Sequence, residues 1–156
     1  MLRIRVTAAL ILISYAQLSW ADGESWNKLR YTGGTVSAKV NPYDWNTTLT
    51  VEPSKITLVF AHRTTLTLAP AQVTALSYGE EAHRRVADMV TLSVVFLNPL
   101  MLFGILHESS NHFVGIEFRT TDGKPGAVLL EADKNNYKAI LAALSQATGK
   151  SVQTAR

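Results

Sequence analysis

The feature that most constrains the fold of this chain is an uncharged, apolar stretch of 18 residues, 89–106. An apolar stretch of this length is a candidate for a transmembrane helix. However, Asn98-Pro99 stands at its centre, and proline breaks or kinks a helix. A single span here would also place the preceding and following strands on opposite sides of a membrane, where they could not share a sheet. The sequence therefore predicts an apolar, helical insert over about residues 86–107.

Three interpretations of this insert remain open. Its two halves form a helical hairpin in one leaflet of a bilayer, each roughly 10–13 Å long at 1.5 Å per residue and too short to cross. Alternatively, the insert packs against a protein partner or a second copy of the chain, or it is ordinary core. An exposed apolar patch of this size marks a binding surface. The predicted membrane or partner contacts are the bulky apolar residues on both sides of the break: Val94, Val95, Phe96, Leu97, Leu100, Met101, Leu102 and Phe103.

Residues 1–21 have the pattern of a secretory signal peptide. Two arginines within the first five residues supply a positive start, and residues 6–16 form an apolar stretch too short to span a bilayer. Small residues then precede a predicted cut before Asp22. We expect an exported protein, periplasmic or secreted, that begins at Asp22. The alternative is an uncleaved N-terminal anchor or a core strand.

Charge and composition exclude several classes of function. The chain carries 15 basic and 12 acidic residues, and removal of the two signal-peptide arginines reduces the net charge from +3 to +1. This balance gives no reason to expect a nucleic-acid partner. The chain contains no cysteine, which excludes disulfides, cysteine-ligated metals and thiol catalysis.

The part before the insert is patterned as short strands. We expect a flexible leader at 22–28, one domain over 29–152 and a tail at 153–156. Within that domain, alternating apolar residues and turn signals predict five strands. These strands are expected at residues 31–40, 48–52, 56–61, 65–68 and 73–78.

A hairpin and a helix are predicted after the insert. Residues 113–118 alternate with a period of two, and Asp122-Gly123 favours a tight turn into a second strand at 127–132. A final helix over 137–148 follows, with Gly149 as its C-cap and Asp133 or Asn135 as its N-cap. Its apolar stripe consists of Tyr137, Ile140, Leu141 and Leu144.

This order of elements resembles the pleckstrin-homology-like (PH-like) barrel over about residues 29–152. The resemblance rests on the strand order, on the hairpin around Asp122-Gly123 and on the helix at 137–148. Residues 73–78 also resemble the strand before the last hairpin in small, exported bacterial members. The resemblance implies an α+β fold, a barrel of about seven antiparallel strands capped by the C-terminal helix. The family's phosphoinositide site is a basic cluster around the first hairpin, where this chain offers only Lys39.

No polar motif in the sequence predicts a catalytic, cofactor-binding or metal-binding site. His107 and His112 superficially resemble a zinc-binding helix motif, but five helical steps turn their rings about 140° apart. Glu80, Glu81 and His83 are expected to form a charged loop before the insert. The favoured function is therefore a non-enzymatic exported module for binding or scaffolding, associated with a membrane or a partner through the insert. The alternative is a small hydrolase that uses His83 or His112 with a carboxylate in a closed pocket.

Overall fold

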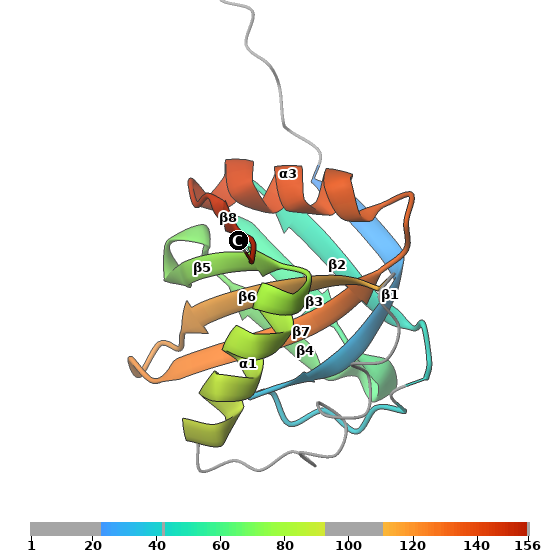
Figure 1. Ribbon diagram of the computed structural model, residues 1–156, viewed down its shortest axis with the longest axis horizontal. Coiled ribbons are helices and arrows are strands. Elements are labelled where there is room, and N and C mark those ends of the chain that lie inside the picture. Colours follow the sequence, from blue (N-terminus) through green and yellow to red (C-terminus); the bar gives the residue numbers. More distant parts are fainter. Residues whose placement is uncertain (1–22, 42, 93–110, 156) are drawn as a thin grey trace, which may run out of the picture.

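The computed structural model describes residues 23–41, 43–92 and 111–155. These residues form an α+β fold of eight strands and two α-helices (Figure 1). Two short 3-10 helices, η1 (Ala61–Arg63) and η2 (Pro70–Gln72), connect strands. The strands are β1 (Glu24–Gly34), β2 (Thr47–Glu52), β3 (Lys55–Val59), β4 (Thr65–Leu68), β5 (Val73–Tyr78), β6 (His112–Arg119), β7 (Pro125–Ala132) and β8 (Val152–Gln153), and the helices are α1 (Glu80–Leu92) and α3 (Tyr137–Thr148).

The strands form one sheet in the order β4-β3-β2-β1-β7-β6-β5-β8. All neighbours are antiparallel except β5 and β8. The long strand β1 joins the two halves, because Leu29 lies opposite both Thr47 of β2 and Ala132 of β7. Irregular registers on either side of Leu29 increase the local twist. Over the described residues the sheet is therefore open, with β4 and β8 at its edges, and the closed barrel of about seven strands is not seen in its pairing.

The start of β1 corrects the sequence analysis. Residues 22–28 were expected to be a flexible leader and the strand to cover 31–40, but β1 begins at Glu24 and ends at Gly34. The early part is ordered because it pairs with β2, with Glu24 opposite Val51. The late part leaves the sheet at Gly34, whose φ of 148° is unfavourable for other residues and whose β-carbon would lie 2.3 Å from the Ala127 carbonyl oxygen.

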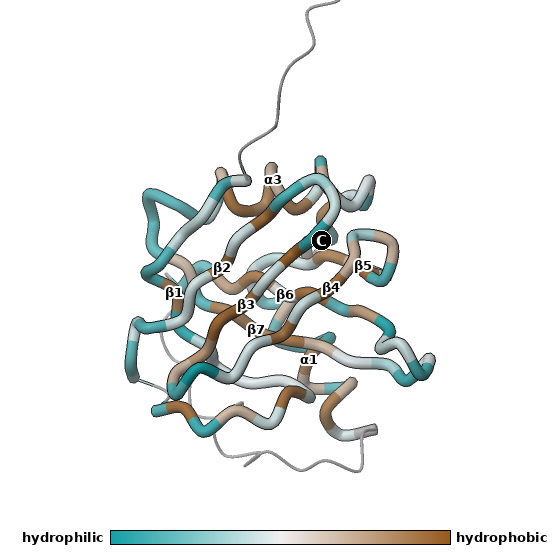
Figure 2. The backbone as a smooth tube through the Cα atoms, turned by 180° about the vertical axis from the view of Figure 1, so that it is seen from behind, coloured by the Kyte–Doolittle hydropathy of each residue, from teal (hydrophilic) through white to brown (hydrophobic). Residues whose placement is uncertain are grey.

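One face of the sheet and α3 enclose the main core. Ile140, Ala143 and Leu144 of α3 are buried in it with apolar residues of the strands, while Leu141 is only partly buried. Figure 2 shows the matching alternation of apolar and polar residues along β3 and β4. Tyr31 packs edge-on against Phe60 with ring centroids 4.7 Å apart. Burial raises the pKa of the Tyr31 phenol, although its hydroxyl donates to the Val36 carbonyl.

The hairpin and the final helix lie where the sequence analysis expected them. Gly123 closes the β6–β7 turn with a φ of 81°, and its N–H bonds the Thr120 carbonyl at 2.9 Å. Helix α3 spans Tyr137–Thr148, and the left-handed Gly149 donates to the Ser145 carbonyl at 2.9 Å. The side chain of Asp133 accepts the N–H groups of two residues that precede the helix, at 2.7 and 3.1 Å. The N-cap position itself is Asn136 and not Asp133 or Asn135.

Strand β8 was not expected. It contains only Val152 and Gln153 and pairs in parallel with β5. Two residues are too few to show an alternating pattern, so Gln153 was expected to lie in the tail.

Candidate functional site

Helix α1 lies across the outer face of β6 and β7 (Figure 1). The charged loop expected at Glu80, Glu81 and His83 is wrong, because these residues form the first turn of this helix. Gly79 has a φ of 67°, and its carbonyl accepts the His83 N–H at 3.2 Å. Two acidic residues in the first turn also complement the helix dipole. The insert was expected from about residue 86, and α1 covers that part as far as Leu92.

The predicted contact residues follow α1 in the chain. Residues 93–110 lie outside the described residues, and with them His107 and every predicted membrane or partner contact. Those residues are Val94, Val95, Phe96, Leu97, Leu100, Met101, Leu102 and Phe103.

The inner side of α1 packs closely on the sheet. Ala82, Val86 and Val90 are spaced four apart and form one row on the helix. They make a second apolar cluster with Phe113 of β6 and with two residues of β7, Ala127 and Leu129. The approach is close at Gly115, where a β-carbon would lie 3.1 Å from the Ala82 β-carbon of α1 and 2.4 Å from Ser77 Oγ of β5. The absence of a side chain at Gly115 thus lets α1 sit directly on β6.

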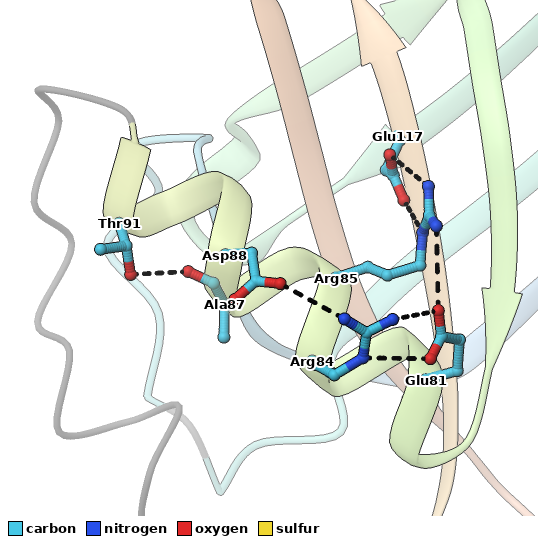
Figure 3. A network of polar contacts seen from close by, with 7 residues as sticks. All are labelled: Glu81, Arg84, Arg85, Ala87, Asp88, Thr91 and Glu117. Atoms are coloured by element: carbon cyan, nitrogen blue, oxygen red, sulfur yellow. Dashed lines mark hydrogen bonds and ion pairs between the residues drawn. The ribbon is translucent and has the colours of Figure 1, made fainter. Parts of the chain in front are cut away.

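A polar network fixes the helix beside this cluster (Figure 3). Arg85 donates two hydrogen bonds to the nearly buried Glu117 of β6, from Nε to Oε1 at 2.5 Å and from Nη2 to Oε2 at 3.1 Å. This hydrogen-bonded pairing raises the pKa of Arg85. On the exposed side, Arg84 donates to Glu81 at 2.7 and 3.2 Å and lies 3.7 Å from Asp88. The hydrogen bonds from Arg84 hold the pKa of Glu81 below its usual value.

A second ion pair joins the neighbouring strands β1 and β7. Arg30 donates to Glu131, and its guanidinium lies 5.4 Å from the centre of the Trp45 ring. Trp45 is 41% exposed and Tyr43 is 78% exposed, so both aromatic residues lie at the surface of the β1–β2 connection. Neither ion pair was predicted from the sequence. Glu117 and Glu131 were visible as acids within otherwise apolar strands, and a buried carboxylate requires a partner.

The two histidines of the hydrolase hypothesis lie in aromatic surroundings. His83 is buried on α1, with its ring 6.0 Å from that of Phe113. His112, at the start of β6, is hydrogen-bonded through Nδ1 to the Tyr78 hydroxyl at 2.7 Å. The His112 ring also stacks on Tyr137 at 3.9 Å. Desolvation and the neighbouring Tyr137 raise the pKa of Tyr78.

A hollow of about 220 Å³ lies between α3 and the β2–β3 turn. It contains the carboxylate-bearing Glu52, which is paired with Lys55 at 3.1 Å, but no histidine. It therefore does not provide the histidine and carboxylate that the hydrolase hypothesis requires in one pocket. The lining residues are Val51, Glu52, Pro53, Ala143, Gln146 and Ala147.

Residues 23–41, 43–92 and 111–155 also bear on metal binding and on membrane crossing. In this part of the chain, no three His, Asp or Glu side chains are grouped so that they could hold a metal ion. None of its helices combines the length and the apolar character needed to cross a membrane.

The fold and site define, over the described residues, an α+β domain with an open, eight-stranded sheet. No family model and no curated protein matches the chain. Among solved structures, the chain is similar to one described as "Structure of the Spt16D Pob3N heterodimer", with 10% sequence identity and a TM-score of 0.48. The match covers 85% of this chain and 53% of that one, so this chain spans about half the length of its structural neighbour. Similarity at this level says nothing about function.

Proposed function

We propose that this protein is an exported, non-enzymatic module for binding or scaffolding, and that its apolar insert holds it at a lipid bilayer surface. A protein partner or a second copy of the chain is the alternative contact for the insert. The residues assigned to this contact are those predicted from the sequence on both sides of Asn98-Pro99.

The placement of α1 is the observation that carries this proposal. The helix packs on the outer face of the sheet, whereas the main core is on the other face and is filled by the strands and α3. The uncharged run at 89–106 begins in the last turn of α1, where Val90 packs on the sheet, and continues beyond the end of the helix. A run that starts from an element on the outside of a filled domain is well placed to contact something other than that domain's own core. An exposed, uncharged run of 18 residues would favour contact with a bilayer or with a protein partner.

The charges of α1 indicate which force would drive the contact. Within α1, Arg84 and Arg85 are paired with Glu81, Asp88 and Glu117, so the helix offers no unpaired basic patch to anionic lipids. Membrane binding would then depend on apolar insertion more than on charge. Because salt screens exposed charges but not apolar burial, we expect the association to resist high salt.

We further propose that the domain is a PH-like barrel of the small, exported bacterial type, with its open end capped by α3. The order of β1 to β7, the β6–β7 hairpin and the helix that follows them support this assignment. The signal-peptide pattern of residues 1–21 supports export to the periplasm or the medium.

Fractionation of the native host tests the lipid contact. The parent protein is expected in the membrane fraction at low and at high salt. Leu97→Glu with Leu102→Glu places two charges in the apolar run, where an unpaired carboxylate costs several kcal/mol to bury. We expect this variant in the soluble fraction with an unchanged melting temperature.

A matched control carries the same two charges elsewhere. Ala139→Glu with Ala142→Glu lies on the exposed side of α3 and should leave the protein in the membrane fraction. A parent protein that is soluble and monomeric at high salt would refute the proposal. In that case the insert belongs to the core, and the Leu97 and Leu102 changes should unfold the domain.

N-terminal sequencing tests export separately. Protein recovered outside the cytoplasm of its host should begin at Asp22. A chain in the exported fraction that still begins at Met1 would show that the apolar start is an anchor.

A further inference from the structure

The start of β1 is held in the sheet from its first residue. It pairs in continuous register with β2, from Glu24 opposite Val51 to Trp26 opposite Leu49. Trp26 is also partly buried against the main core. The beginning of this strand is therefore fixed both by main-chain pairing and by side-chain packing.

Gly23, the residue before β1, is enclosed by the end of β2. A β-carbon at Gly23 would overlap Glu52 Cγ and would lie 2.9 Å from the Val51 carbonyl oxygen. Val51 and Glu52 also line the hollow between α3 and the β2–β3 turn, and β1 starts beside α3 (Figure 1). On this side of Gly23 there is thus no room even for a methyl group.

Only Asp22 separates this fixed region from the predicted cut of the signal peptide. Hydrolysis of the bond between Ala21 and Asp22 consumes water and leaves a carboxylate on Ala21 and a free amino group on Asp22. A peptidase must hold the chain on both sides of this bond in its active site, which requires backbone that is free of other contacts. In the folded domain, Gly23 and Glu24 cannot be freed without separating β1 from β2.

We propose that residues 1–21 are removed before β1 pairs with β2, and that the folded domain is no longer a substrate for the peptidase. This inference rests on the proposed export and adds an order of events to it. The chain is exported and cut while it is unfolded, and it folds afterwards. A precursor that folds first keeps its apolar leader and remains tethered to the membrane.

The size of the effect follows from how seldom the start of β1 opens. Cleavage of a folded protein proceeds through locally opened forms, and its rate follows their population when opening and closing are fast. If the first pairs of β1 are open for less than a tenth of the time, the folded precursor is cut at least tenfold more slowly than an accessible site.

A spacer at the cut tests this order directly. Six alternating glycine and serine residues between Asp22 and Gly23 add up to about 20 Å of extended chain, more than the helix diameter of about 10–12 Å, and glycine still follows Asp22. Folded, full-length precursors in detergent micelles are incubated with the signal peptidase of the host. The parent should be cut at least tenfold more slowly than the spacer variant, whose product should begin at Asp22.

The matched control carries the same six residues between Thr154 and Ala155, which are exposed and follow β8. It should resist cleavage as the parent does, and all three precursors should show the same thermal melt.

A second measurement needs no insertion. The parent precursor and a synthetic peptide of residues 1–30 are cut in parallel at rising urea concentrations at which the enzyme still cuts the peptide. The ratio of the two rates should rise with the unfolded fraction of the precursor, measured by tryptophan fluorescence.

The outcomes separate this inference from the export on which it rests. Equal cleavage of the folded parent and the spacer variant, or a ratio that unfolding does not change, would overturn the order of events and leave the signal peptide intact. Rapid cleavage of the control with the spacer in its tail would also overturn it. If neither the spacer variant nor the peptide is cut, residues 1–21 are not a signal peptide and both proposals fail.

Discussion

The close packing of α1 on β6 can be tested by substitution of Gly115. A β-carbon at this position would lie 2.4 Å from Ser77 Oγ, and 3.1 and 3.3 Å from the β-carbon and α-carbon of Ala82. Overpacking of this kind typically costs about 1–3 kcal/mol. Alanine in place of glycine returns about 0.4–1 kcal/mol by restricting the unfolded chain. We therefore expect Gly115→Ala to lower the free energy of unfolding by about 1–2 kcal/mol.

Most of the expected loss of stability in Gly115→Ala comes from crowding against the Ser77 hydroxyl. It is buried and has no hydrogen-bond partner among the described residues. Ser77→Ala removes both the closest contact and a buried, unsatisfied hydroxyl, and should stabilise the protein by about 1 kcal/mol. In that background only the contacts with Ala82 remain. Gly115→Ala should then change the free energy of unfolding by less than about 0.5 kcal/mol, because the gain from the unfolded state offsets the residual crowding.

Urea unfolding of the parent, the two single variants and the double variant measures this coupling. The double-mutant cycle should give an interaction energy of about 1–2 kcal/mol, as expected for residues in contact. In a domain of this size, 1 kcal/mol corresponds to a shift in melting temperature of about 4 °C. If Gly115→Ala costs the same with serine and with alanine at position 77, then Ser77 Oγ does not lie against Gly115 as described. If Gly115→Ala stabilises the parent, then α1 leaves room for a β-carbon on β6 and does not pack on it as closely as described.

Three further predictions concern the core, the ion pairs and pH. Leu144→Asp places an unpaired charge in the main core and should abolish cooperative thermal unfolding at the parent's melting temperature, whereas a melt within about 2 °C of the parent would show that α3 does not close that core. Arg85→Ala leaves the nearly buried Glu117 without its partner and should destabilise the protein by about 3–5 kcal/mol, whereas the control Arg84→Ala, at an exposed pair, should cost less than about 1 kcal/mol in the same urea titration. Because Arg84 lowers the pKa of Glu81, the ionised Glu81 carboxylate stabilises the folded protein above the unfolded-state pKa of about 4.3, and this stabilisation is lost as the pH falls through the lower folded-state pKa. Glu81→Gln should therefore reduce the dependence of the free energy of unfolding on pH only below about pH 5.

Local pattern was sufficient to predict the elements whose partners are close in sequence. The hairpin at Asp122-Gly123 and the helix from Tyr137 to Thr148 are specified by turn residues and by helical spacing within a few positions. The end of β1 was predicted less well because Gly34 stops the strand through a contact with Ala127, far away in the sequence. Val36 and Ala38 still pack against the core although they lie outside the strand. Their alternating apolar pattern therefore indicated that they are buried, but not that they belong to a strand.

In the candidate site too, features set by local sequence were predicted and features set by distant contacts were not. The apolar run and a helix from about residue 86 were predicted, but the first turn of α1 was missed, because Glu80 and Glu81 resemble a solvated loop when Gly79 is not known to turn the chain. The pairing of Arg85 with Glu117 joins residues 32 positions apart and depends on how α1 crosses the sheet. No spacing rule in the sequence contains that information.

Strand β1 pairs with β2 on one side and with β7 on the other, and these two pairings can form at different stages of folding. Strands β2 to β4 follow β1 directly, so that half can assemble as soon as they are synthesised. The other half cannot, because Arg30 of β1 meets Glu131 of β7 across 101 positions of chain. Closing so long a loop is slow compared with local pairing. One edge of β1 therefore stays unpaired until nearly the whole chain is present, and during that interval it is open to pairing with the strands of other chains.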